Sequence, residues 1–270
     1  MRAETNTGTV LDRILEARRA AVEHRKKVLP ETALKYGVKA APPVRDFAAA
    51  LSADRINILA ELKPASPSRG VIRDPFDATG LAKSLEAAGA AALSVLTEEE
   101  FFHGSLKNLR DARKNIAIPV FRKDFIFDPW QVWESRATDA DSFLLIVAAL
   151  SDGLLCDLLS IGRELGMEAL VEVHTHPELQ RALAAGARII GVNNRDLKTL
   201  SVRPELSLEL IQEIPDDCIA IAESGLRTAA DLRKLRSAGF DAFLIGEYLM
   251  EAPDPGAALK SLLAPPDAQL

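Results

Sequence analysis

Eight short apolar segments recur along the chain, and this repetition constrains the fold more than any other feature of the sequence. They are Ile56–Leu62, Ala91–Leu96, Ile118–Phe121, Phe143–Val147, Ala169–Val173, Ile189–Val192, Ile219–Ala222 and Ala242–Ile245. They are spaced roughly 20 to 35 residues apart, and each is apolar almost throughout rather than alternating with polar residues. Such segments are typical of strands buried on both faces, as in a parallel sheet covered by helices.

The stretches between these segments have the periodicity of helices. Phe76–Ala88, Pro177–Ala185 and Thr228–Ala238 are each followed directly by a glycine, the residue preferred just after a helix. Eight strand–helix units within about 215 residues predict the α/β class and a (β/α)8 TIM barrel. The alternative is an open, doubly wound sheet, but no GxGxxG motif follows the first apolar segment, as that fold would favour.

The first 50 residues do not follow this rhythm. We expect residues 1–50 to form an N-terminal helical extension packed on a barrel of residues 51–270, within one domain overall. Leu11–Lys27 has the pattern of an amphipathic surface helix, Phe47–Leu51 suggests a short second helix, and three prolines break the stretch between them. The extension either helps to cover the active site or simply adds a stabilising helix, and both interpretations remain open at this stage.

Charge and composition limit the partners and the compartment. The 33 basic and 39 acidic residues give a net charge of −6, whereas duplex binding normally needs a basic excess, so we expect no nucleic-acid partner. The longest apolar run, Phe143–Leu150, is far shorter than the ~20 residues of a membrane helix. Met1–Leu15 has no apolar secretory core, which predicts a cytoplasmic protein. The oligomeric state stays open, and a monomer is one of the allowed states.

The two cysteines provide no structural framework. Cys156 and Cys218 lie far apart and have no CxxC companion, so we expect neither a disulfide nor a zinc site. We expect two buried thiols in a reducing compartment.

Charged side chains stand at the ends of the strand segments, where barrel enzymes build their active sites. Glu61 and Lys63 end the first segment and share one face by strand alternation. Later segments end at Lys123, Glu172, Asn193, Arg195, Glu223 and Glu247. Charges are rare in buried strands unless they are paired or functional. The pattern predicts lysines acting as general acids or anion clamps, or one forming a Schiff base, with Glu172 as general acid or base.

Glycines directly after the last two strand segments suggest a phosphate site. Ser224-Gly225 and Gly246-Glu247 stand where barrels often bind phosphate through backbone N–H groups. Ser66, in the loop after the first segment, could add a hydroxyl. Simple turn glycines are the alternative.

One pair of histidines deserves a separate interpretation. His174 and His176 lie near the end of the fifth segment, but the sequence offers no obvious third ligand, and a metal site is therefore not expected. Walker A, HExxH and GxSxG motifs are also absent from the sequence.

The same residues lie in motifs that together resemble the indole-3-glycerol-phosphate synthase family, the barrel enzymes of tryptophan biosynthesis. The motifs are AELKPASPSRG (60–70), LSVLTEEEFFHGS (93–105), PVFRKDFIFDPWQVWESR (119–136), LLIVAAL (144–150), ALVEVH (169–174), GVNNRDL (191–197), IAESGL (221–226) and FLIGEYLM (243–250). The segment LDRILEARRAAVEHRK (11–26) also resembles the extension helix of the family. These motifs span nearly the whole chain in family order.

The resemblance implies a lyase that closes a ring, decarboxylates and dehydrates 1-(2-carboxyphenylamino)-1-deoxyribulose 5-phosphate, with no metal or organic cofactor. It implies that Lys123 is the general acid of ring closure, Lys63 a second essential lysine and Glu172 the general base of dehydration. Which lysine serves which step stays open. The resemblance assigns orienting roles to Glu61, Asn193 and Glu223, the anthranilate side to Arg195, phosphate binding to Ser66, Ser224, Gly225, Gly246 and Glu247, and aromatic walls to Phe102 and Phe125.

Two residues depart from the family pattern, and other functions compete with the synthase. Pro64 stands where a second basic residue is common, and Tyr248 where Ser or Ala is frequent. An alternative is another phosphate-binding barrel enzyme, such as an isomerase or an aldolase with Lys123 as Schiff-base nucleophile. A third hypothesis is a non-catalytic barrel acting as a ligand sensor or scaffold.

Overall fold

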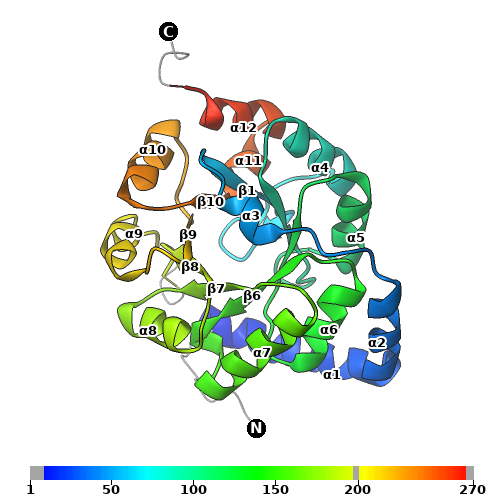
Figure 1. Cartoon of the computed structure of the whole chain (residues 1–270). Helices are drawn as coiled ribbons and strands as arrows, with labels where there is room; N and C mark the ends of the chain where they lie inside the picture. Colours follow the sequence, from blue (N-terminus) through cyan, green and yellow to red (C-terminus); the bar gives the residue numbers. More distant parts are fainter. Residues whose placement is uncertain (1–8, 197–200, 266–270) are drawn as a thin grey trace.

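Eight parallel strands close into a barrel in the order β1-β10-β9-β8-β7-β6-β5-β4 (Figure 1). The computed structural model describes residues 9–196 and 201–265, so both the predicted extension and the predicted barrel include residues outside these ranges. The strands are β1 (Asn57–Leu62), β4 (Ala92–Leu96), β5 (Val120–Lys123), β6 (Ser142–Ile146), β7 (Leu170–Val173), β8 (Ile189–Asn193), β9 (Ile219–Glu223) and β10 (Ala242–Ile245). A small antiparallel hairpin, β2 (Ala65–Ser66) with β3 (Gly70–Val71), follows β1. The predicted strands and the predicted barrel are therefore confirmed.

Helices surround the barrel on its outer face (Figure 1). They are α4 (Ala78–Ala87), α5 (Leu106–Asn115), α6 (Pro129–Ala137), α7 (Asp152–Glu164), α8 (His176–Ala184), α9 (Glu205–Leu210), α10 (Ala229–Ala238), α11 (Glu247–Glu251) and α12 (Pro255–Leu263), with short 3-10 turns at Val147–Ala149 and Ile211–Glu213. Gly89 and Gly239, which end α4 and α10, adopt φ angles of 104° and 117°, as the sequence pattern predicts for glycine at a helix end. Within the described ranges, no helix combines the length and apolar character that a membrane span requires.

Two hydrophobic layers explain why the strand segments are apolar throughout. All six residues of β1 are buried. Ile58, Ala60 and Leu62 belong to the layer between strands and helices, whereas Leu59 belongs to the layer inside the barrel. Because side chains alternate along a strand, Glu61 shares the interior face with Leu59. The same alternation that builds the core therefore delivers a carboxylate to the carboxyl end of the barrel interior.

The N-terminal extension contributes to both ends of the barrel. It comprises α1 (Val10–Val28), α2 (Glu31–Ala40) and α3 (Phe47–Leu51). At the amino ends of the strands, the ring of Phe47 on α3 stacks on that of Phe121, with centroids 5.5 Å apart. Helix α1 lies near the opposite end, where its first residues reach the interior layer. The extension thus both closes the floor of the barrel and borders its rim.

Helix α2 is a difference between the sequence pattern and the structure, because the prolines around it indicate a break rather than a helix. Pro30 instead serves as the N-cap residue of α2, with extended backbone before the first helical turn. Proline is compatible with a helix start, where its missing N–H is not needed. The helix packs against α6 (Figure 1) and buries Leu34. The prolines therefore delimit this helix rather than abolish it.

A buried chain of charges joins α1 to the end of strand β5. Arg18 Nη2 lies 2.5 Å from Asp124 Oδ2. The same oxygen lies 2.8 Å from Nη2 of Arg122, which also contacts Glu134 Oε2 at 2.9 Å. Arg25 Nη2 then reaches Glu134 Oε1 at 2.6 Å. The Arg122 side chain is fully buried on the helix side of β5, so its neighbour Lys123 faces the barrel interior.

The cysteines are less buried than expected. Both thiols are free, but Cys156 is exposed and Cys218 is half-buried. Cys156 lies on α7 away from its buried stripe of Leu155, Leu158 and Leu159. The expectation of two buried thiols was wrong. Cys156 faces solvent from α7, and Cys218 lies just before β9, where its side chain is only half-buried.

Candidate active site

A cavity of about 430 Å³ opens at the carboxyl ends of the barrel strands. Every site residue predicted above lines this cavity. They are Glu61, Lys63, Ser66, Phe102, Lys123, Phe125, Glu172, Asn193, Arg195, Glu223, Ser224, Gly225, Gly246 and Glu247. Residues far apart in the sequence meet here because parallel strands in a closed barrel all end at one rim.

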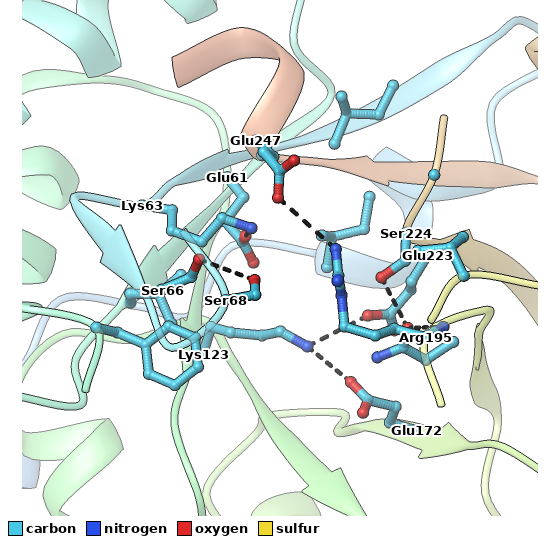
Figure 2. Close-up of a pocket in the computed structure, with 18 of the residues that line it drawn as sticks. Glu61, Lys63, Ser66, Ser68, Lys123, Glu172, Arg195, Glu223, Ser224 and Glu247 are labelled. Carbon is cyan, nitrogen blue, oxygen red and sulfur yellow. Dashed lines mark hydrogen bonds and ion pairs between the residues drawn. The ribbon is translucent and has the colours of Figure 1, made fainter. Parts of the chain in front are cut away.

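Two lysines and three carboxylates form the centre of the cavity (Figure 2). Lys123 Nζ lies 2.7 Å from Glu172 Oε2 and 3.2 Å from Glu223 Oε2. On β1, Lys63 Nζ lies 2.9 Å from Glu61 Oε1. Figure 2 shows Lys123 reaching across from β5 towards Glu172. The arrangement places potential proton donors beside potential proton acceptors.

The environment separates the proton affinities of these groups. Burial alone would lower the pKa of Lys123, but Glu172, Glu223 and Glu61 outweigh it and raise that pKa above its usual range. Burial alone would raise the pKa of Glu172, yet Lys123 and His174 hold it well below the ordinary value. Burial, reinforced by Glu172 and Glu61 against the opposing effect of Lys123, raises the pKa of Glu223 to about 8. Near neutral pH the cavity thus holds a charged acid, Lys123, beside a charged base, Glu172.

The surroundings of the Glu223 carboxyl favour its neutral, protonated form. Its Oε1 is buried and has no hydrogen-bond partner within the part of the chain that the structure describes. A buried oxygen without a donor cannot easily carry negative charge, since an isolated buried carboxylate is costly. This environment agrees with the raised pKa of Glu223.

Backbone geometry at the end of β9 shapes the next part of the rim. Ser224 has φ 67° and Gly225 has φ 81°. A positive φ is uncommon for a residue other than glycine and tends to occur at functional turns. Ser224 Oγ donates a hydrogen bond of 2.8 Å to Asn193 Oδ1, which also accepts the Arg195 N–H at 3.0 Å. The turn after β9 is therefore tied through Asn193 to the end of β8.

Arginines gather around Glu247 at the mouth. The carboxylate of Glu247 lies 3.6 Å from Arg195 Nη2, 3.4 Å from Arg69 Nε and 3.3 Å from Arg227 Nη2. Figure 2 shows the contact between Glu247 and Arg195. Sequence reasoning identified neither Arg69 nor Arg227, because both lie in loops outside the strand-end pattern. Arg69 and Arg227 also contact Glu251, so three arginines against two glutamates leave a net charge of +1 at this end of the cavity, which suits an anion.

The other side of the cavity is apolar. The rings of Phe102 and Phe125 lie 6.0 Å apart between centroids and are tilted by 39°. Val10, Leu11 and Ile14 of α1 also line the cavity. A flat aromatic group would find apolar contacts on this side. The extension therefore borders the site as well as adding a helix.

Comparison with known proteins identifies the family of the chain. A family profile described as "IGPS: Indole-3-glycerol phosphate synthase" matches residues 11–262. A Rhodococcus jostii protein named indole-3-glycerol phosphate synthase is 49% identical over 255 residues, covering 94% of this chain and 95% of the relative. A Roseiflexus protein of the same name is 47% identical over 263 residues, covering 94% and 98%.

Solved structures show the same fold at low sequence identity. A 3-hexulose-6-phosphate synthase superimposes with a TM-score of 0.61 at 15% identity, covering 77% of this chain and 98% of the other. The N-acetylmannosamine-6-phosphate 2-epimerase from Clostridium perfringens gives a TM-score of 0.60 at 15% identity, covering 77% and 93%. At this identity the likeness concerns the barrel alone.

Proposed function

The chain belongs to the indole-3-glycerol phosphate synthase family, and from this premise we propose how the residues of the rim cavity carry out its reaction. The activity is that of a carboxy-lyase. It converts 1-(2-carboxyphenylamino)-1-deoxyribulose 5-phosphate to indole-3-glycerol phosphate, carbon dioxide and water. The observation that carries our assignment of residues is the position of Lys123 Nζ, 2.7 Å from Glu172 and 3.2 Å from Glu223.

Ring closure requires an acid at the ketone of the substrate. The ring carbon that bears the carboxylate attacks the ketone carbon, and the ketone oxygen takes up a proton as the new carbon–carbon bond forms. Lys123 is the donor, since its ammonium lies at the centre of the cavity between Glu172 and Glu223. The carboxylate then leaves as carbon dioxide, and its bonding electrons restore the aromatic ring. A positioned acid of this kind typically contributes about 10²- to 10⁴-fold to the rate.

Dehydration requires an acid and a base together. The hydroxyl formed from the ketone leaves as water, and the neighbouring ring carbon loses a proton to complete the indole. Glu172 takes this proton, because it is held in the charged form. Lys63 donates to the leaving hydroxyl, with Glu61 holding its ammonium at 2.9 Å. The contact between Glu172 and Lys123 then offers a route for returning a proton to the first acid.

Substrate orientation follows from the two ends of the cavity. The phosphate is assigned to the cationic end, where Ser66, Ser224, Gly225, Gly246 and the backbone of Glu247 lie. The anthranilate ring is assigned to the wall of Phe102 and Phe125, with Arg195 near its carboxylate. Asn193 and Glu223 orient the lysine and the sugar hydroxyls. Such positioning lowers the entropic part of the barrier.

The test replaces Lys123 by methionine, which keeps an unbranched side chain only one atom shorter than lysine but cannot donate a proton. We expect Lys123→Met to lower kcat by at least about 100-fold, measured as the rise in indole fluorescence without added metal. The control is Lys107→Met, because Lys107 is 82% exposed on the surface and should leave turnover unchanged. If Lys123→Met folds, as judged by circular dichroism, and keeps near-normal turnover, the assignment of the acid is wrong.

A Schiff-base aldolase is disfavoured by the same contacts. A nucleophilic lysine must lose its proton, whereas the ionised carboxylate of Glu172, 2.7 Å away, stabilises the ammonium of Lys123. Incubation with a ketose phosphate and borohydride should therefore leave Lys123 unmodified, and reduction onto this residue would favour the aldolase.

We propose the cytoplasm as the compartment, because free thiols such as Cys156 persist under reducing conditions. All predicted lining residues come from one chain, so we propose that a single copy forms a complete site.

A further inference from the structure

We propose that His174 is a positioning residue for Glu172: its imidazolium holds the carboxylate in the orientation and charge state that proton transfer needs. This inference rests on the proposed role of Glu172. It arises from the histidine pair that the sequence pattern singled out and that the reaction above does not use.

The imidazole of His174 lies between two carboxylates. Its Nε2 is 3.2 Å from Glu172 Oε1, and its Nδ1 is 3.3 Å from Glu178 Oε2. Glu172 Oε2 faces the other way and contacts Lys123 at 2.7 Å. The Nε2 approach is an ion pair by distance but not an aligned hydrogen bond, since this buried nitrogen has no hydrogen-bond partner in the part of the chain that the structure describes. Each oxygen of Glu172 therefore faces its own cationic group, and the two attractions together favour one orientation of the carboxylate.

The far side of His174 is anchored by the start of helix α8. Glu178 Oε2 accepts the backbone N–H of His174 at 2.8 Å, and the backbone N–H of Glu178 donates to Thr175 Oγ1 at 3.3 Å. A carboxylate in the first turn of a helix is also favoured by the helix dipole. The backbone hydrogen bonds therefore fix the Glu178 side chain, and the contact between Glu178 Oε2 and His174 Nδ1 in turn restricts the imidazole.

Burial makes the contact between His174 and Glu172 significant. The side chain of His174 is 8% exposed and that of Glu172 is 3% exposed, so water screens their interaction weakly. Glu172 on β7 and Glu178 on α8 are in direct contact with the imidazole, while Lys123 on β5 lies one contact further away and Glu223 on β9 two. Burial alone would lower the pKa of His174, but the two glutamates raise it to about 9. The ring is therefore an imidazolium at neutral pH.

The neighbouring histidine has a different environment and provides a matched control. His176 Nδ1 lies 2.6 Å from Glu213 Oε1, and its side chain is 48% exposed. The two histidines thus point to separate partners rather than to a shared ligand. His176 plays no part in the cavity described above.

The imidazolium of His174 affects the reaction through Glu172, the proposed base of dehydration. With a cation beside each oxygen, Glu172 stays ionised, and its Oε2 stays directed at Lys123. Without the imidazolium, the carboxylate would rotate more freely and would protonate at higher pH, since a removed positive charge raises the pKa of an acid. The protein would then lose active base at higher pH than the wild type does, on the acidic side of the ordinary pKa of a glutamate.

The test compares His174→Gln with His176→Gln in steady-state kinetics from about pH 3, below the ordinary pKa of a glutamate, to about pH 9. We expect His174→Gln to lower kcat by roughly 10- to 100-fold with KM changed by less than about threefold. We also expect the acidic limb of the kcat/KM profile to move up by about one pH unit. His176→Gln should change neither kcat nor the profile. Unchanged kcat and an unchanged acidic limb in His174→Gln would overturn the inference.

Two further measurements separate the possible failures. Glu172→Gln should lose turnover, and adding His174→Gln to it should cause little further loss, because the histidine acts through the glutamate. If Glu172→Gln keeps full turnover, the proposed role of Glu172 fails. If it loses turnover but His174→Gln behaves like the wild type, only the role of His174 fails. Should His174→Gln not fold, NMR titration of the wild-type imidazole decides: protonation persisting above pH ~8 supports the inference, and ordinary titration near ~6.5 overturns it.

Discussion

Asp124 holds together the buried charges that join the N-terminal extension to the barrel, and its replacement by asparagine should be severely destabilising. Its Oδ2 accepts from three donors, Arg18 Nη2 at 2.5 Å, Thr97 Oγ1 at 2.6 Å and Arg122 Nη2 at 2.8 Å. Its Oδ1 accepts the backbone N–H of Phe125 at 2.8 Å. All of these groups donate a hydrogen bond to the carboxylate of Asp124.

An asparagine cannot satisfy this environment in either orientation. If the amide oxygen takes the Oδ2 position, the amide NH₂ faces the donor of Phe125. If the amide is reversed, the NH₂ faces two buried guanidinium groups. Because both arginines would also lose their shared negative charge at a site only 1% exposed, we expect Asp124→Asn to lower the free energy of unfolding by about 3–5 kcal/mol. That is a large part of the ~5–15 kcal/mol typical of a domain.

Denaturant unfolding, followed by fluorescence and by circular dichroism, measures this loss. The control is Asp111→Asn, which breaks the exposed pair with Lys107 and should change stability by no more than about 0.5 kcal/mol. In the double variant Arg18→Met/Asp124→Asn the two effects should not add, since both remove the same contact. A loss below about 1 kcal/mol for Asp124→Asn would refute the reasoning, because it would mean that the buried arginines do not depend on this carboxylate.

Two other substitutions test the cavity itself. Gly246→Ala should lower kcat/KM about 10-fold or more, because the added Cβ would lie 2.4 Å from Glu61 Oε1 and displace this carboxylate. The control is Gly153→Ala, whose added Cβ has no atom within 4 Å, and it should keep full activity. Equal kinetics for the two variants would contradict the prediction. Glu223 has its pKa raised from 4.5 to about 8, so its contribution to stability is fully present below the unfolded value and is lost as pH rises through the folded value. Glu223→Gln should therefore gain thermal stability relative to the wild type between about pH 5 and about pH 8, and a constant difference in Tm across that range would argue against the shifted pKa.

The strands and the rim were predictable because their signals are local. An apolar segment such as Phe143–Val147 indicates a strand that is buried on both faces. The glycine after each of several helices indicates a residue with a positive φ. Once eight such units indicate a closed barrel, geometry alone brings Lys123, Glu172 and Glu223 to one rim. The charged residues at the strand ends therefore follow from topology, whereas Phe102 and Phe125 follow only from the family resemblance, and the position of Arg227 was not predicted.

The missed features depend on contacts between segments distant in the chain. Arg18 and Arg25 lie on the buried face of α1, spaced with Leu11, Ile14 and Val22, and this helical phase was the available sign that they are not solvent charges. Their partners on β5 and α6 lie more than a hundred residues away in the sequence. Polar character alone does not distinguish a buried arginine from an exposed one.

The sequence by itself determined the barrel, the end of it that carries the chemistry and the charged strand-end residues that line the cavity, since each depends on short-range periodicity and on chain order. Only the tertiary structure decided which carboxylate each cation meets. It pairs Lys63 with Glu61, Lys123 with Glu172 and Glu223, and His174 with Glu172. The physical reason is that proton affinities depend on distances of a few ångströms and on burial, and both arise only when the strands have closed on one another.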